Sequence, residues 1–150
     1  MKKFILLFFI SFLGYADIYA QTTHQIWNEV QFMQIGTSPY LLSDNYILMD
    51  NIGIVTSPVD GIFTGDFDGN GYTITLDIDT YNPFYSTPTA LFSVVGVNGV
   101  IRNINVDGIV EGSFVAGIVC FLLDNATIEN CINNCNIIGT ADVAGIVAYF

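Results

Sequence analysis

The segment Val115-Ala116-Gly117-Ile118-Val119, VAGIV in one-letter code, recurs unchanged at Val143–Val147. A weaker copy begins at Ala90 and precedes Gly117 by nearly the same spacing. Repetition at a fixed period of about 20 to 50 residues is typical of proteins built from stacked structural units. The repeat therefore indicates such an array, and the residues between the copies decide which kind.

The offset that places Ala90 on Gly117 aligns the first two units without a gap as far as Asn130. One inserted residue between Asn130 and Val143 then brings the two VAGIV segments into register. The alignment predicts these stacked pairs: Leu91 with Ile118, Phe92 with Val119, Val94 with Phe121, Val95 with Leu122, Asn98 with Asn125, Ile101 with Ile128, Asn103 with Asn130 and Ile104 with Cys131.

Each unit contains short runs rich in Ile and Val that end at Gly or Asn, and none has a ten-residue stretch of helical periodicity. We therefore expect an all-β fold, a right-handed parallel β-helix (a solenoid) with about 27–28 residues per coil. Asn103 over Asn130 would form an amide ladder at one bend. Gly117 over Gly145 would mark a second bend that excludes side chains. The alternative is a β-sandwich whose strands share this spacing by coincidence.

Upstream of the repeat, Thr22 and Thr23 predict the start of a short amphipathic helix, with Ile26, Val30 and Met33 on one face. This helix would cap the open N-terminal end of the coils, where unpaired strand edges promote aggregation. Residues 46–49, 61–63 and 72–78 read as strands of the first coils, and residues 81–88 as a protruding loop. The cap and first strands thus occupy residues 21–60, and the coils occupy 61–150.

Residues 1–20 have the pattern of a cleaved signal peptide. Lys2 and Lys3 precede a ten-residue, mostly apolar run from Phe4 to Leu13, and Ala20 offers a small residue before the cut. A run of this length is too short to span a bilayer, which needs about 20 apolar residues. We expect secretion or cell-surface localisation, with no membrane insertion of the mature chain. An uncleaved anchor is the alternative.

The composition excludes several classes of function. With 52% hydrophobic residues the chain is not disordered. Removing residues 1–20 from a chain of 14 acids and three bases leaves thirteen acids against Arg102, a net charge of about −12. Nucleic acid is therefore excluded as a partner, since phosphate contacts need Lys and Arg. Three cysteines, Cys120, Cys131 and Cys135, read as buried thiols, and a Cys131–Cys135 disulfide in an oxidising exterior stays open.

The segment Phe63–Ile74, FTGDFDGNGYTI, resembles the F-x-G-x-F-D-G-N-G-x-T-I stretch of secreted bacterial β-helix proteins that carry GLUG motifs. Residues 46–52 resemble the Y-x-L-x-x-D-I stretch that precedes it, although Asn51 replaces the usual Asp. The segment 90–93, the segment 101–104 and the two VAGIV copies are similar to the family's later repeats, with Ser93, Ala116 and Ala144 where Gly is common.

The resemblance covers about residues 24–150 and implies the β-helix fold. It implies a non-enzymatic, adhesin-like, cell-surface role whose partner is a host or environmental glycan or a surface protein. The alternatives are a non-catalytic module of a surface metallopeptidase, because the IgA-protease family also contains such regions, and a polysaccharide-active β-helix enzyme. The chain stops soon after Gly145 begins a coil, so we expect a fragment of a longer protein.

Two groups of residues are candidate binding sites, and we assign no catalytic residue. Asp66, Asp68 and Asn70 form D-x-D-x-N-G, the first half of a calcium loop, and Asp77 falls at its twelfth position. The alternative is a tight turn in which Gly69 and Gly71 supply positive φ.

Tyr81, Phe84 and Tyr85 in the protruding loop are candidates for stacking against a carbohydrate. Folding of these aromatic rings onto the coil is the alternative. Asp77 and Asp79 alternate on one strand face, and we interpret them as a solvated face because no base lies near them in the sequence.

Overall fold

The computed structural model describes residues 21–82 and 87–150. The expected signal peptide, residues 1–20, lies outside the described residues, as do Phe84 and Tyr85. Within the described ranges the chain is mostly β-strand, with one short helix, and the all-β prediction is confirmed at this level. All strand pairings in the four described sheets are parallel.

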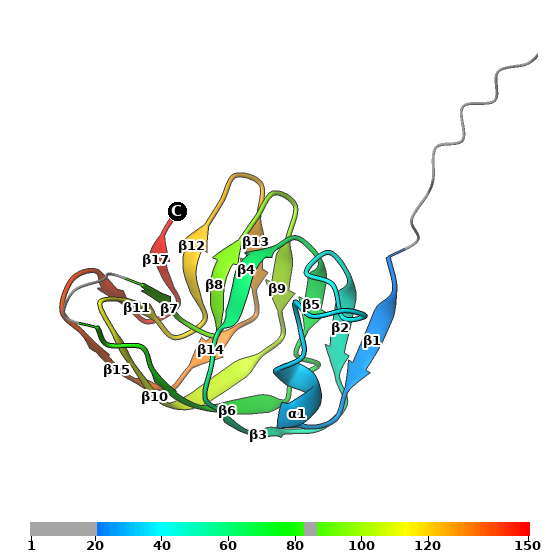
Figure 1. Ribbon diagram of the computed structural model, residues 1–150, viewed down its shortest axis with the longest axis horizontal. Helices are drawn as coiled ribbons and strands as arrows, with labels where there is room; N and C mark the ends of the chain where they lie inside the picture. Colours follow the sequence, from blue (N-terminus) through cyan, green and yellow to red (C-terminus); the bar gives the residue numbers. More distant parts are fainter. Residues whose placement is uncertain (1–20, 83–86) are drawn as a thin grey trace, which may run out of the picture.

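The chain visits the four sheets in turn and returns to each one at the next level, so strands distant in sequence lie side by side (Figure 1). The first sheet contains β1 (Thr23–Ile26), β2 (Asn45–Leu48), β5 (Asp66–Asp68), β9 (Val100–Arg102) and β13 (Thr127–Glu129). The second contains β3 (Ile52–Val55), β6 (Thr73–Asp79) and β10 (Asn105–Gly112), and β10 then pairs with both β14 (Ile132–Asn133) and β15 (Asn136–Gly139).

The other two sheets complete each turn of the chain. The third contains β7 (Pro88–Thr89), β11 (Phe114–Ala116) and β16 (Val143–Ala144). The fourth contains β4 (Val59–Phe63), β8 (Phe92–Val95), β12 (Val119–Leu122) and β17 (Val147–Tyr149).

The strand register confirms four of the predicted pairs. Phe92, Val94 and Val95 pair with Val119, Phe121 and Leu122 in the fourth sheet. Ile101 pairs with Ile128 in the first sheet. The two VAGIV copies lie side by side, with Val115 on Val143 and Ala116 on Ala144 in the third sheet and Val119 on Val147 in the fourth.

The predicted asparagine ladder is present at the bend that follows the first sheet. Asn103 and Asn130 have φ angles of 53° and 52°, and Asn130 Nδ2 donates to Asn103 Oδ1 at 3.2 Å. Asparagine tolerates this left-handed conformation better than most residues because its short amide bonds locally. At the second predicted bend, a Cβ on Gly117 would lie 2.6 Å from the Gly145 carbonyl oxygen, so a side chain is excluded there. Gly145 does not meet the prediction, because a Cβ there would make only an ordinary contact, 3.8 Å from Asn133 Nδ2.

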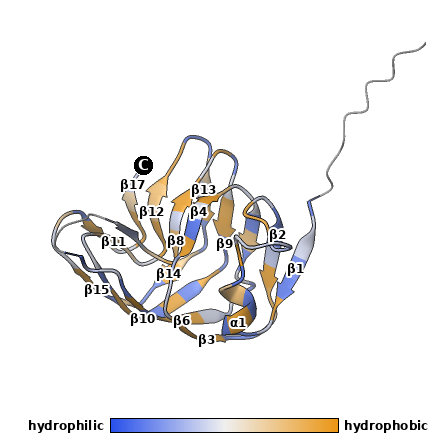
Figure 2. Ribbon diagram, in the orientation of Figure 1, coloured by the Kyte–Doolittle hydropathy of each residue, from blue (hydrophilic) through white to orange (hydrophobic). Residues whose placement is uncertain are grey.

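The core lies between the sheets and is filled level by level. Ile101, Ile104 and Val119 are fully buried. Phe67 and Phe92 pack edge-to-face with ring centroids 5.2 Å apart, an arrangement that aromatic rings favour. Figure 2 shows hydrophobic residues along these facing strands, with more hydrophilic turns between them.

The predicted N-terminal helix is wrong in its start and its buried face. Thr23 to Ile26 form strand β1, which pairs with β2, and helix α1 spans Glu29–Phe32. Asn28 is the N-cap, because its Oδ1 accepts from Gln31 N at 3.0 Å.

The side chain that α1 buries is Phe32, whose ring lies 5.8 Å from Phe67 and 6.4 Å from Phe92. Val30 and Met33, the predicted apolar face, are 58% and 43% exposed. The helix packs against β3, at the N-terminal end of the stack. Among the described residues, no helix has the length and apolar character needed to cross a membrane.

Candidate functional site

The predicted calcium loop lies beside Arg102, the one Lys or Arg within residues 21–150. Arg102 Nη2 is 3.1 Å from Asp66 Oδ2, and Arg102 Nε is 3.3 Å from Asp68 Oδ2. The other oxygen of Asp68 accepts from Asn70 N at 2.8 Å and from Asn103 Nδ2 at 3.0 Å. Both carboxylates therefore already have a cationic partner within the protein.

The fourth predicted calcium ligand is placed elsewhere. Asp77 lies on the exposed face of β6, in the second sheet, whereas Asp66 and Asp68 lie on β5 in the first. In residues 21–82 and 87–150, no three His, Cys, Asp or Glu side chains lie close enough together to hold a metal ion. The geometry favours the alternative interpretation, a structural turn.

That turn differs from its prediction at one glycine. Asn70 and Gly71 have φ angles of 51° and 80°, as expected, but Gly69 does not have a positive φ. Gly69 is required by close packing instead, because a Cβ there would lie 2.5 Å from Ile104 Cβ and 2.6 Å from Asn103 O. The next level of the stack thus rests directly on Gly69.

The pKa of Asp66 is raised because the effect of burial outweighs that of the Arg102 charge. Burial raises the pKa of this carboxyl, and the charges of Asp68 and Glu129 raise it further, while Arg102 lowers it. Since Arg102 already pairs with two carboxylates, it is engaged in the structure rather than free to contact a substrate.

Of the three aromatic residues predicted to contact a carbohydrate, Tyr81 is the one that lies within the described residues. Tyr81 is 49% exposed, and its backbone N–H donates to Asp79 Oδ1 at 2.9 Å. Asp77 and Asp79 both face outward on β6 with buried Ile78 between them, which confirms the predicted solvated face.

A cavity of about 430 Å³ lies near the predicted loop, and Tyr81 itself is not among the residues that line it. Thr80 and Asn82, the neighbours of Tyr81, are part of its wall. Its lining consists of hydroxyl groups, one amide, one carboxylate and two proline rings. The lining residues are Ser57, Pro58, Asp60, Thr80, Asn82, Thr87, Pro88 and Ser93. The hydroxyl of Thr80 bonds to that of Thr89, and Thr87 Oγ1 donates to Thr80 Oγ1 at 3.2 Å. We call this cavity the loop groove. Polar groups that converge on one cavity can contact the hydroxyl groups of a sugar.

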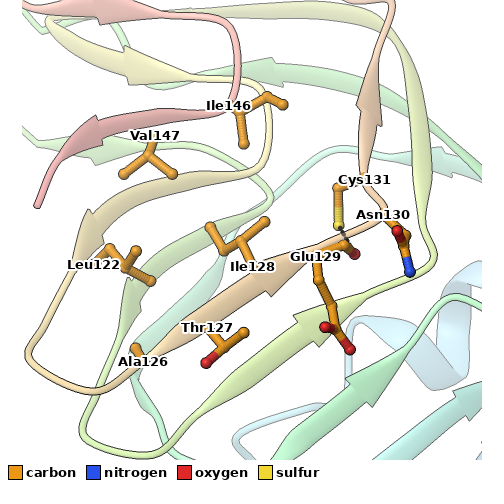
Figure 3. A pocket seen from close by; sticks show the side chains of 9 residues that line it. All are labelled: Leu122, Ala126, Thr127, Ile128, Glu129, Asn130, Cys131, Ile146 and Val147. Carbon is orange, nitrogen blue, oxygen red and sulfur yellow. Dashed lines mark hydrogen bonds between the residues drawn. The ribbon is translucent and has the colours of Figure 1, made fainter.

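A second cavity, of about 520 Å³, opens at the other end of the stack from α1. Figure 3 shows its lining side chains on β12, β13 and the segment leading into β17. They are Leu122, Ala126, Thr127, Ile128, Glu129, Asn130, Cys131, Ile146 and Val147. We call this cavity the end groove. Sequence reasoning missed this cavity, because its lining residues come from three separate stretches of the chain.

The three cysteines are free thiols. Cys120 is buried against Ala90 and Ala116, and Cys131 and Cys135 pack against the core. Burial is the largest cause that raises the pKa of all three, that of Cys135 to about 11. Because the thiolate is the reactive form, such thiols are inert at neutral pH. This arrangement favours the prediction of buried, hydrophobe-like cysteines.

One polar cluster near the N-terminus was not predicted. His24 Nε2 lies 2.9 Å from Asp44 Oδ2, and the His24 ring is 4.8 Å from the ring of Tyr40 and 5.2 Å from that of Tyr46. Burial, and then the charge of Asp44, raise the pKa of Tyr46. The His24–Asp44 pair links β1 to the residue that directly precedes β2. Two residues so far apart in the sequence give no spacing signal that would reveal the pair.

Comparison of the chain with family models, with curated proteins and with solved structures finds no match.

Proposed function

We propose that this chain is a secreted or cell-surface protein of the GLUG-motif kind, built as a right-handed parallel β-helix. Its role is adhesin-like: it displays loops for contact with a glycan or a surface protein and catalyses no reaction. Residues 1–20 direct export as a signal peptide and are then cleaved off, and the mature chain neither binds nucleic acid nor inserts into a membrane.

The observation that carries the proposal is the parallel register of all four sheets. Phe92 on Val119 and Ile101 on Ile128 keep one and the same sequence offset in two different sheets. A stack held in one register by backbone hydrogen bonds is stiff, and it holds each loop at a fixed position. Such a stack can display a contact surface, a function that requires no reactive group.

The loop groove is the contact surface that we assign. Asp60 provides a carboxylate and Thr80 and Thr87 provide hydroxyls around one cavity of about 430 Å³. Tyr81, the next residue after Thr80, adds a half-exposed aromatic ring that is not part of the lining. Neutral sugars offer both apolar ring faces and hydroxyl groups, so they match this mixture. A neutral or cationic glycan is expected rather than an anionic one, because the mature chain carries a net charge of about −12.

A glycan array probed with residues 21–150 tests the proposal. We expect binding to a limited set of neutral glycans, with loss of signal in Tyr81→Ala and Asp60→Asn. Asp124→Asn is the matched control, since it removes an exposed carboxylate that does not line the loop groove. Absence of binding, or equal binding by all four proteins, would refute the assigned surface.

Localisation needs a separate measurement. Expression of the full sequence in a bacterium, followed by fractionation and N-terminal sequencing, should yield exported protein that starts at Gln21. Retention of Met1 in the cytoplasm would contradict the proposed export.

A further inference from the structure

The loop groove includes an irregularity in the fourth sheet. The register of β4 on β8 shifts between Val59 and Ile62, so that Asp60 and Gly61 of β4 lie opposite a single residue of β8, Ser93. Such a β-bulge re-aims side chains, and bulges are common beside active sites. Gly61 has a φ of 91°, a left-handed conformation that glycine adopts without strain. Because Asp60 and Ser93 both line the loop groove, the bulge brings two polar groups together in its wall.

The bulge also orients the carboxylate of Asp60. The backbone N–H of Gly61 donates to Asp60 Oδ1 at 2.9 Å, and the side chain stays exposed. Within the part of the chain that the structure describes, no basic side chain pairs with Asp60, and Arg102 is held by two other carboxylates. Asp60 therefore has lone pairs available for a hydroxyl group in the loop groove.

Ser93 is the second polar group at the bulge. It is only 4% exposed, and it lines the loop groove. Among the described residues, its hydroxyl has no hydrogen-bond partner, whereas the hydroxyls of Thr80 and Thr87 in the same wall bond to each other at 3.2 Å. Most buried hydroxyls in proteins are hydrogen-bonded, and an unpaired one is destabilising. A ligand in the groove would supply the missing partner.

We propose that Ser93 and Asp60 determine the specificity of the loop groove by binding two hydroxyl groups of one neutral sugar ring. This inference rests on the proposed function, since it concerns the glycan that the groove binds. The hydroxyl of Ser93 donates to the oxygen of one sugar hydroxyl, and the carboxylate of Asp60 accepts from another. Because neighbouring strands lie about 4.8 Å apart, one ring can reach both groups.

These two groups select against two kinds of sugar. A deoxy sugar without the hydroxyl that faces Ser93 leaves the serine unpaired, so its affinity is lower by the effect of one hydrogen bond. A uronic acid brings a second carboxylate towards Asp60, and no lining residue of the groove is basic. The ligand is therefore a neutral sugar whose ring hydroxyls are unsubstituted.

A comparison of sugars with residues 21–150 tests the role of Ser93. Saturation-transfer NMR with the methyl glycosides of glucose, galactose and mannose identifies the glycoside that binds best. Derivatives that each lack one of its hydroxyls are then titrated. The wild-type protein should bind one derivative about fivefold more weakly than the parent glycoside. Ser93→Ala should bind the parent about fivefold more weakly and should not distinguish it from that derivative, because both changes remove the same bond.

The matching methyl uronide tests the role of Asp60. Asp60→Asn keeps an acceptor oxygen but loses the charge, so it should reduce the preference for the neutral glycoside over the uronide. Thr75→Ala is the matched control, since it removes a hydroxyl from β6 in the second sheet, outside the lining of the loop groove. It should leave every affinity unchanged. Circular dichroism checks the fold, and Ser93→Ala should be at least as stable as the wild type because its hydroxyl is unpaired without ligand.

The results separate this inference from the proposed function. If a glycoside or an array glycan binds but Ser93→Ala binds it as the wild type does, the proposal is wrong and the proposed function stands. The same holds if the losses from the serine and from the sugar hydroxyl are additive, or if Asp60→Asn leaves the preference against the uronide unchanged. If neither the glycosides nor any array glycan binds, both are wrong.

Discussion

Substitution of Asn103 tests how much the asparagine ladder contributes to the stability of the fold. Its φ of 53° is left-handed, its Nδ2 donates to Asp68 Oδ1 at 3.0 Å, and its Oδ1 accepts from Asn130 Nδ2 at 3.2 Å. Asn103→Ala removes both hydrogen bonds, worth about 1 kcal/mol each. It also places Cβ without a compensating amide in a conformation that costs about 1–2 kcal/mol. We expect the free energy of unfolding to fall by about 3–4 kcal/mol.

Asn103→Gly separates the two causes. Glycine removes the same hydrogen bonds but adopts the left-handed conformation without strain, although it makes the unfolded chain more flexible by about 0.5–1 kcal/mol. The loss should therefore be about 2–3 kcal/mol, smaller than for alanine. Asn136→Ala is the matched control, an exposed strand asparagine expected to change stability by less than about 0.5 kcal/mol.

Urea unfolding of residues 21–150, followed by circular dichroism, measures these differences as shifts in midpoint at a constant slope. Equal losses for alanine and glycine would show that backbone strain plays no part. Losses no greater than in the Asn136 control would refute the ladder as a source of stability.

Three further predictions concern single residues. Asp66→Asn should raise the unfolding temperature at pH 7 and change it little at pH 3. The pKa of Asp66 is higher in the folded than in the unfolded protein. The stability that Asp66 contributes is therefore present below about pH 4 and is lost as the pH rises through the folded pKa. An equal effect at both pH values would refute this. Gly69→Ala should destabilise by about 1–3 kcal/mol in urea, because its Cβ would overlap Ile104, and an unchanged midpoint would contradict the close packing. Cys135 should react slowly with iodoacetamide at pH 8 and faster towards pH 11, as mass spectrometry of the labelled peptide can follow; rapid labelling at pH 8 would contradict its raised pKa.

The repeat in the sequence was sufficient to predict the register of the later levels. Each unit from Ala90 onward has nearly the same length, so one offset, with a single inserted residue, aligns every pair between Phe92 and Val147. Left-handed Asn103 and Asn130 were predictable for the same reason. Asparagine at the same place in consecutive units marks a bend.

The earlier levels were not predictable in this way. The stretch of chain from Asp79 to Thr89 is longer than the stretch between their partners, Glu111 and Val115. The longer loop changes the offset, so that Asp68 meets Arg102 at a greater separation in the sequence than the later units share. The ion pairs of Arg102 were therefore hidden from an alignment at the offset of the later units.

The helix at the N-terminus was predicted wrongly, and the polar cluster beside it was not predicted, for a different reason. A four-residue helix is too short to show periodicity, and tertiary pairing of β1 with β2 overrides the helical pattern of Ile26, Val30 and Met33. The pair His24–Asp44 depends on how the connecting chain folds back, which local sequence does not encode.

The loop that lengthens one level has a use in protein engineering. The residues between Asp79 and Pro88 extend the chain without shifting the register of β7 and β8 on the level above. Since the cost of closing a loop grows only slowly with its length, this position should accept foreign sequence. A peptide epitope inserted there would be displayed on a rigid scaffold, so the chain could be used as a carrier in vaccine or sensor design.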